Sequence, residues 1–179
     1  MSRKKRTFSL KKWQLLGLCV AIVLISLLIF WVVNTQNKST QDAEEKSSRR
    51  ASALNTADES AEAVISKGGS VNDAAKVYQD SVNATGDNST KAGLLFNEAV
   101  LYFNNGNLDK ALELALQSLE FDNNEGTDRF LAVVYESKGD KVNAIKYYQM
   151  AIDNIVTIKD SGNGYSVEYY QNKIKELQG

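Results

Sequence analysis

Residues that could carry catalytic or metal chemistry are few in this 179-residue sequence. Histidine, the commonest general acid/base and neutral metal ligand, is absent. The single cysteine, Cys19, lies within an apolar run and can form no intrachain disulfide. The stretch DNNEG at 122–126 lacks the alternating oxygen ligands and the closing glutamate of a calcium loop. We therefore predict a chain that is not an enzyme, with no catalytic residues, no cofactor and no metal.

Charge is distributed unevenly along the chain. Six of its 21 Lys and Arg residues lie in residues 1–33, which hold no Asp or Glu, so the remainder has 15 cations against 22 anions, a net charge of −7. Binding of nucleic acid requires clustered Lys and Arg to neutralise phosphates. This charge therefore predicts that nucleic acid is not a partner.

An uncharged apolar run, LLGLCVAIVLISLLIFWVV, occupies residues 15–33 with Ser26 as its one polar side chain. As a helix rising 1.5 Å per residue, such a run spans roughly the 30 Å hydrocarbon core of a bilayer. Trp13 and Trp31 lie near its two ends, where aromatic rings prefer the headgroup region. The sequence predicts a transmembrane helix over residues 13–33, through which the protein contacts the lipid bilayer.

The cations before this run predict its orientation. Residues 1–12 form a basic tail, which the positive-inside rule places in the cytoplasm. Residues 34–179 are then extracytoplasmic, and the protein is a single-pass protein of the cell membrane with a signal-anchor. A cleaved signal peptide is disfavoured, because the apolar run is longer than a typical h-region and no small-x-small site follows closely.

A polar segment, NTQNKSTQDAEEKSSRR, covers residues 34–50. It has neither Gly nor Pro, and its Ala, Glu, Lys and Arg favour helix. Both a flexible linker and a solvated extension of the anchor helix remain open, and so does one continuous helix over residues 34–67.

Three segments farther along the chain share a pattern: KGGSVNDAAKVYQDSV at 67–82, NNGNLDKALELALQSLEFD at 104–122 and KGDKVNAIKYYQMAI at 138–152. Aligning Gly69, Gly106 and Gly139 gives spacings of 37 and 33 residues, and the excess falls in the loop-like stretch NATGDNST. One insertion in a repeated unit produces this discrepancy. We therefore predict a repeated helix–turn–helix unit, with each turn at a glycine that can adopt positive φ.

Small, aromatic and glycine positions recur across these units. In the middle unit they hold Leu95, Ala99, Tyr102, Gly106, Ala111, Ala115 and Ser118. In the third they hold Asp128, Ala132, Tyr135, Gly139, Ala144, Tyr148 and Ala151, and in the first Asp58, Glu62, Ile65, Gly69, Ala74, Tyr78 and Ser81. Over about residues 55–158 this pattern resembles the tetratricopeptide repeat family, without the proline that the family has near the end of each unit. The resemblance implies an all-α solenoid of about three helix pairs, over residues 51–158.

A terminal helix is needed to shield the last apolar face of such an array. Residues 159–179 are predicted to be a loop and a capping helix, with Ser166 as the N-cap. The apolar residues of this helix at helical spacing are Tyr169, Tyr170, Ile174 and Leu177.

In the tetratricopeptide family the inner, concave surface is lined by the first helix of each pair. Carried over, the resemblance implies a partner-binding groove, with Phe96, Val100, Phe103 and Asn104 from the middle unit and Arg129, Val133 and Glu136 from the third; Gly93, Gly126 and Ser137 complete the set. Phe96 and Phe103 share a helix face opposite to Leu95 and Tyr102. That face fits a peptide or partner helix, unless a helix within 41–67 or the capping helix covers it.

These observations predict a membrane-anchored protein–protein interaction module, an adaptor or chaperone-like protein that presents its groove to a protein or peptide partner outside the cytoplasm. The alternative is a self-associating scaffold of an envelope or membrane assembly, which would make the chain a homo-oligomer. Hydrolysis of a glycan is disfavoured because no carboxylates are paired at a meaningful spacing.

Overall fold

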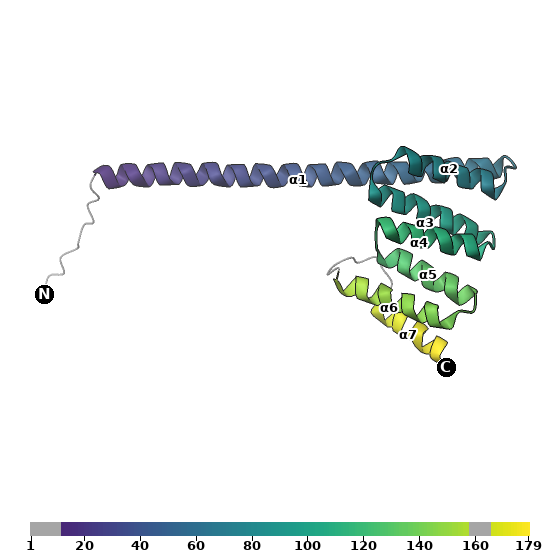
Figure 1. The fold of residues 1–179 in the computed structure, drawn as a ribbon. Helices are drawn as coiled ribbons and strands as arrows, with labels where there is room; N and C mark the ends of the chain where they lie inside the picture. The colour runs from purple at the N-terminus through teal and green to yellow at the C-terminus, as the bar shows by residue number, and fades with distance from the viewer. Residues whose placement is uncertain (1–11, 158–165) are drawn as a thin grey trace. The chain divides into compact units, whose positions relative to one another are not determined.

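The computed structural model describes residues 12–157 and 166–179 of the chain (Figure 1). In these residues the protein forms seven α-helices and no strand, so the expected all-α class is confirmed. The contacts divide the chain into two units, residues 1–48 and a compact unit from Arg49 to Gly179. The predicted basic tail, except for Lys12, and most of the loop before the last helix lie outside the described residues.

Helix α1 spans Lys12–Ser66 and contains the apolar run. From Val20 to Val33 its large apolar side chains are exposed in the structure. Among the described residues α1 is the one helix long and apolar enough to cross a membrane, which makes it the candidate span. Residues 34–66 continue the same helix, consistent with the absence of Gly and Pro between residues 18 and 66.

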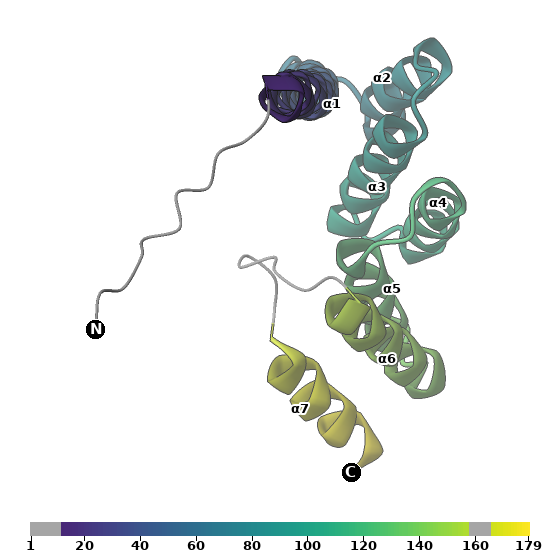
Figure 2. The same cartoon turned by 90° about the vertical axis from the view of Figure 1, so that its left-hand side faces the viewer.

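Six shorter helices complete the compact unit: α2 (Val71–Ala84), α3 (Asn88–Asn104), α4 (Leu108–Phe121), α5 (Glu125–Ser137), α6 (Lys141–Thr157) and α7 (Val167–Gln178). From α2 onward each helix packs against the next along the chain, as Figures 1 and 2 show. The C-terminal part of α1 joins this unit by packing Ala57 and Ala61 against Ala74 and Leu94 of α2 and α3. The finer description, a tetratricopeptide-like solenoid, stays a prediction.

Side chains that accept hydrogen bonds from the first turn define where these helices begin. Ser70 and Asp73 form a reciprocal capping box at α2, with N–H donors 3.2 and 2.9 Å from the side-chain oxygens. Asn124 caps α5 by accepting from the N–H of Thr127 at 3.0 Å. The predicted N-cap Ser166 accepts from the N–H of Tyr169 at 3.3 Å, so this prediction is confirmed.

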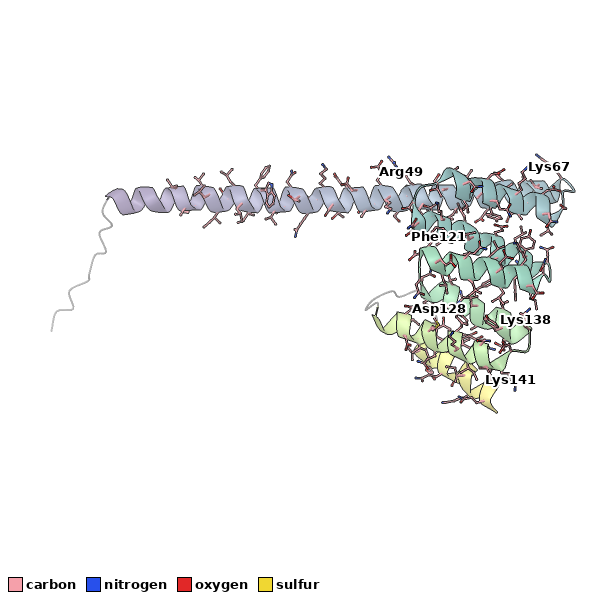
Figure 3. All side chains as sticks on the ribbon, viewed as in Figure 1. Arg49, Lys67, Phe121, Asp128, Lys138 and Lys141 are labelled. Carbon is pink, nitrogen blue, oxygen red and sulfur yellow. The ribbon has the colours of Figure 1, made fainter. Side chains whose placement is uncertain are left out.

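The turn from α1 to α2 corrects the register predicted for the first unit. The positive φ falls at Gly68 (87°), as it does at Gly106 (78°) and Gly139 (75°), whereas the sequence alignment had placed Gly69 there. This turn therefore has one residue more than the corresponding turn between α3 and α4. The turns at Lys67 and Lys138 lie on the same side of the compact unit in Figure 3.

The residues that precede this turn are accordingly displaced by one position. Ala57 and Ala61 are 2% and 3% exposed and take the places that the alignment had given to Asp58 and Glu62. Glu62 is exposed, and Ile65 is 40% exposed. The prediction for this helix was therefore wrong by one residue. Gly69 matches the spacing to the buried Ala74 and Tyr78 of α2, but Gly68 takes the turn position, so only the residues before the turn are displaced.

Small residues allow the helices to approach closely, as predicted. Ala99, Ala111, Ala132 and Ala144 are fully buried. Larger side chains fill the space between them, and full burial of each contributes about 1.5–3 kcal/mol. Tyr170 of α7 is also fully buried and belongs to the same core, so α7 packs on the helices before it. That α7 caps a repeat array stays a prediction.

Candidate partner-binding site

Two pockets lie along the C-terminal part of α1 and helix α3. The first, here named the Arg50 pocket, has a volume of about 280 Å³ and is lined by Arg50, Leu54, Ala92, Gly93, Phe96, Asn97, Asn124, Gly126, Thr127 and Arg129. The second, here named the Ile65 pocket, has a volume of about 350 Å³ and is lined by Ala61, Glu62, Ile65, Ser66, Tyr78, Leu101, Asn104 and Asn105. Both helices run from the first pocket to the second.

A polar contact joins the two helices between these pockets. The side-chain amide of Asn97 on α3 donates to both carboxylate oxygens of Asp58 on α1, at 2.9 and 3.1 Å. The hydroxyl of Tyr78 on α2 donates to the same carboxylate at 2.8 Å. Burial and this hydrogen bond raise the pKa of the Tyr78 hydroxyl above its ordinary value, so it stays a neutral donor. The contact fixes α1, α2 and α3 against one another midway along the site.

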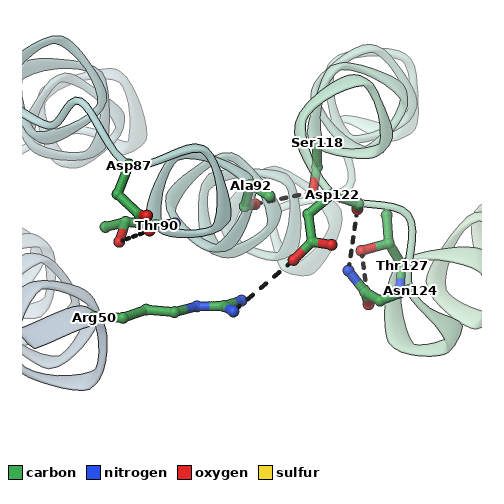
Figure 4. A network of polar contacts seen from close by, with 8 residues as sticks. All are labelled: Arg50, Asp87, Thr90, Ala92, Ser118, Asp122, Asn124 and Thr127. Atoms are coloured by element: carbon green, nitrogen blue, oxygen red, sulfur yellow. Dashed lines mark hydrogen bonds and ion pairs between the residues drawn. The ribbon is translucent and has the colours of Figure 1, made fainter. Parts of the chain in front are cut away.

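Two arginines give the Arg50 pocket a cationic side. The Arg50 guanidinium lies 3.9 Å from the Asp122 carboxylate at the end of α4, and both side chains are about one-third exposed (Figure 4). Arg129 of α5 lies 3.7 Å from Glu125, one turn earlier on the same helix. Burial raises the pKa of Glu125, while the charge of Arg129 opposes that effect. Because these ion pairs are partly exposed, an anionic ligand can compete with Asp122 and Glu125 for the two arginines.

The Ile65 pocket is more apolar. Ile65 is 40% exposed, and Leu101 of α3 is half-buried opposite it. Glu62 is the one charged residue in its lining. Asn104 and Asn105 at the end of α3 supply amide groups at its rim. This arrangement suits one apolar side chain with polar backbone beside it.

Phe96 and Phe103, predicted as open groove residues, are half-buried. Each ring meets Phe130 of α5 edge-on, with centroid distances of 5.3 and 5.5 Å. Phe130 itself is buried in the main core. The three rings thus join α3 to α5, and Phe96 has a second role because it also lines the Arg50 pocket.

The other predicted groove residues are divided among different surroundings. Val100 is half-buried and packs against the main core, and Val133 is also half-buried. Glu136 accepts hydrogen bonds from the Tyr148 hydroxyl at 2.8 Å and from Lys173 of α7 at 3.0 Å. Burial opposes ionisation of Glu136, but the bonds from Lys173 and Tyr148 outweigh it and lower its pKa. Glu136 therefore joins α5 to α6 and α7.

Part of the predicted groove is occupied by α1. A Cβ atom added to Gly93 would lie 2.9 Å from the nearest methyl group of Leu54. The sequence left open whether a helix within residues 41–67 covers the groove. At Gly93 it does, because Leu54 of α1 lies against this position. Of the predicted site residues, the structure brings Phe96 and Arg129 together in the Arg50 pocket and places Asn104 in the Ile65 pocket.

Among the lining residues that the sequence reasoning missed are Arg50, Leu54, Asn97, Ile65 and Leu101. It also missed Phe130, which lines neither pocket but packs against the ring of Phe96. Arg50 had been assigned to the polar linker, although the compact unit begins at Arg49. Asn97 follows Phe96 and Phe130 follows Arg129 in the sequence, so both lie next to a predicted groove residue. Considering every aromatic and amide side chain of these helices, whatever its position in the repeat, would have found them.

The chain matches no protein-family model and no curated protein. Where the structure describes the chain, the fold is all-helical and contains one candidate membrane span. In residues 12–157 and 166–179 no group of three acidic or cysteine side chains is placed to hold a metal ion.

Proposed function

We propose that this protein is a membrane-anchored interaction module that binds an extended segment of a partner protein along α1 and α3. The observation that carries the proposal is the presence of two pockets on one pair of helices, one cationic and one apolar. The resemblance to tetratricopeptide repeats supports it, because that family uses its first helices for binding. The role is that of an adaptor or chaperone-like protein.

The spacing of the pockets supports a short linear segment as the ligand. Phe96 and Asn104, which line different pockets, are eight positions apart on α3. At 1.5 Å per residue this corresponds to about 12 Å along the helix axis. An extended chain covers that length with about four residues. A partner segment with an acidic group near one end and an apolar side chain near the other matches the two pockets.

The site is proposed to lie outside the cytoplasm. The six cations before the apolar run favour a cytoplasmic N-terminus by the positive-inside rule. The compact unit that follows α1 would then be exposed on the far side of the cell membrane. Its net negative charge is repelled by anionic lipid headgroups, so a protein is a more suitable ligand than the membrane surface.

A photocrosslinking experiment tests the proposal. A photoreactive residue is placed at Asn104 in the full-length protein in its membrane, and Ile65→Glu is combined with it. We expect an adduct with a partner protein at position 104 that is lost with Ile65→Glu, because a carboxylate in the apolar pocket opposes binding. Val142→Glu is the matched control, since Val142 is an apolar residue 78% exposed on α6, outside both pockets.

Two results would count against the groove. One is an adduct that persists with Ile65→Glu. The other is an equal loss of the adduct with Val142→Glu. An adduct between two copies of this chain at position 104 would instead favour the self-associating scaffold.

A further inference from the structure

A third pocket lies on another side of α3, between α2, α3 and α4. It has a volume of about 280 Å³, and it is named here the Glu98 pocket after one of its lining residues: Gln79, Val82, Asn83, Leu95, Glu98, Lys110, Glu113, Leu114 and Gln117. It shares no residue with the Arg50 and Ile65 pockets. Its volume is below the range of pockets for small organic ligands, and it suits the end of one side chain.

Glu98 is fully buried, at 0% exposure. Its Oε1 atom accepts a hydrogen bond from the side-chain amide of Gln79 at 2.9 Å. Its Oε2 atom is buried and has no hydrogen-bond partner among the described residues. Burial of an acceptor that receives no hydrogen bond costs free energy. A hydrogen-bond donor beside Oε2 of Glu98 would remove this cost.

Comparison with the next predicted unit shows that helix packing does not require a carboxylate at position 98. In the next unit the corresponding residue, 33 positions later, is Leu131, which is also fully buried. An apolar side chain therefore fits the same position between the helices. The chain nevertheless carries a carboxyl group there, and burial raises the pKa of this carboxyl group.

The cation nearest to this pocket is already engaged. The ammonium of Lys110 lies 2.8 Å from Oε1 of Glu113, and Gln117 donates to the same oxygen at 3.3 Å. This hydrogen bond to Glu113 raises the pKa of Lys110, so it remains charged. Two carboxylates and one ammonium thus line the pocket, which leaves it with an uncompensated negative charge when all three are ionised.

We propose that the Glu98 pocket binds a cationic side chain, arginine or lysine, of a partner protein. Either supplies the missing donor to Oε2 of Glu98, and its positive charge compensates the buried carboxylate. The net charge of −7 beyond residue 33 attracts cationic segments to this unit. The proposal goes beyond the groove on α1 and α3 and does not depend on it.

The test uses the full-length protein in detergent micelles and three probes, Nα-acetyl-arginine amide, Nα-acetyl-lysine amide and Nα-acetyl-alanine amide. Binding is followed by the NMR signals of the side-chain amides of Gln79 and Gln117, which lie on two sides of the pocket. We expect saturable shifts of both amides with a cationic probe and none with the alanine probe. A larger response to one of the two cations identifies which side chain the site takes.

Two variants make the test specific. Glu98→Gln keeps the size of the side chain but removes its charge, and we expect it to weaken binding of the cationic probe at least tenfold. Glu120→Gln makes the same change of net charge at an exposed position of α4 outside the pocket, and we expect it to bind as the unaltered protein does. Circular dichroism verifies that both variants keep their helix content.

A second measurement reports on Glu98 directly. The carboxyl ¹³C shift of Glu98 gives its pKa, which a bound cation should lower and the alanine probe should leave unchanged. The proposal is overturned if no probe gives a saturable shift, because Glu98 is then only a buried structural carboxyl. It is equally overturned if Glu98→Gln binds the cationic probe as tightly as Glu120→Gln, because the probe is then held by general charge attraction.

Discussion

Asn97 of α3 donates hydrogen bonds from its side-chain amide to both carboxylate oxygens of Asp58 on α1, at 2.9 and 3.1 Å. These residues are 39 positions apart in the sequence. The contact ties the C-terminal part of α1 to α3 within the compact unit. The Tyr78 hydroxyl donates to the same carboxylate, so three helices depend on one side chain.

Replacing this carboxylate should therefore destabilise the compact unit. Asp58→Ala leaves the Asn97 amide and the Tyr78 hydroxyl without their acceptor, and each partly buried group costs about 1–3 kcal/mol. Urea unfolding of the full-length protein in detergent, followed by circular dichroism, measures the loss. Glu59→Ala removes the same charge from the next, exposed residue and should change the free energy of unfolding by less than about 0.5 kcal/mol. Equal effects of the two variants would contradict the structural role of Asp58.

Gly69 should tolerate no side chain. A Cβ atom there would lie 2.6 Å from Cγ1 and 2.8 Å from the carbonyl oxygen of Val64, and the carbonyl cannot move without the backbone of α1. Gly69→Ala is therefore expected to lower the free energy of unfolding by about 1–3 kcal/mol.

Gly86→Ala is the matched control for this prediction, because nothing lies within 4 Å of its added Cβ. It should leave stability unchanged or raise it by up to about 1 kcal/mol, since alanine restricts the unfolded chain. Thermal unfolding of the two variants side by side gives the comparison. A Gly69→Ala protein as stable as Gly86→Ala would mean that the α1–α2 turn is not as tight as described.

Asp128 should make stability depend on pH. Burial raises its pKa from 3.8 to about 6, and the hydrogen bond from Asn154 only partly offsets this. The folded protein thus holds this proton more tightly than the unfolded chain does, so stability falls as pH rises from about 4 through 6. This difference between the folded and unfolded pKa corresponds to on the order of 3 kcal/mol of stability. Asp128→Asn should be the more stable protein at pH 7, and its free energy of unfolding should fall less over this range.

The comparison needs a control because other carboxyl groups also titrate there. Asp80→Asn removes an exposed carboxylate and should reproduce the pH profile of the unaltered protein. Urea unfolding at pH values between 4 and 7 gives the three profiles. Parallel profiles for Asp128→Asn and the unaltered protein would show that Asp128 does not bind its proton more tightly when folded.

The orientation in the membrane can be measured with single cysteines. Cys19, the one natural cysteine, lies in the apolar run, where a polar maleimide does not react. Val142→Cys, at a position 78% exposed, should be labelled in intact cells by a maleimide that cannot cross membranes. Ser2→Cys in the basic tail should be labelled only after the membrane is permeabilised. The reverse pattern would overturn the proposed orientation.

Local features of the fold were predictable because they depend on nearby residues. The apolar run, the helix at residues 167–178 and its cap Ser166 follow from periodicity and capping chemistry within a few positions. The buried alanines followed from the repeat, since equivalent positions must allow the same close approach of helices. These features needed no knowledge of which helices would become neighbours.

Features that depend on the backbone or on distant contacts were not predictable. Gly69 matches the spacing to Ala74 in α2, and only the observed φ shows that Gly68 takes the turn position, which displaces the residues of α1 by one. Arg50 lines a pocket with residues of α3 and α5 and lies 3.9 Å from Asp122, a residue 72 positions away. The burial of Phe130 between Phe96 and Phe103 likewise depends on how α5 meets α3, which residue spacing within one helix does not determine.

The packing of each helix on its neighbours in the chain has a consequence for how the protein folds. Contacts between consecutive helices join residues close in sequence, and chains rich in such local contacts fold rapidly. The last helix, α7, has a neighbour in the chain on one side only. It is held by the buried ring of Tyr170, by apolar side chains that pack on the core beside it and by the contact of Lys173 with Glu136. Opening should therefore begin at the C-terminal end, where amide protons exchange with solvent first, and reach α3 last.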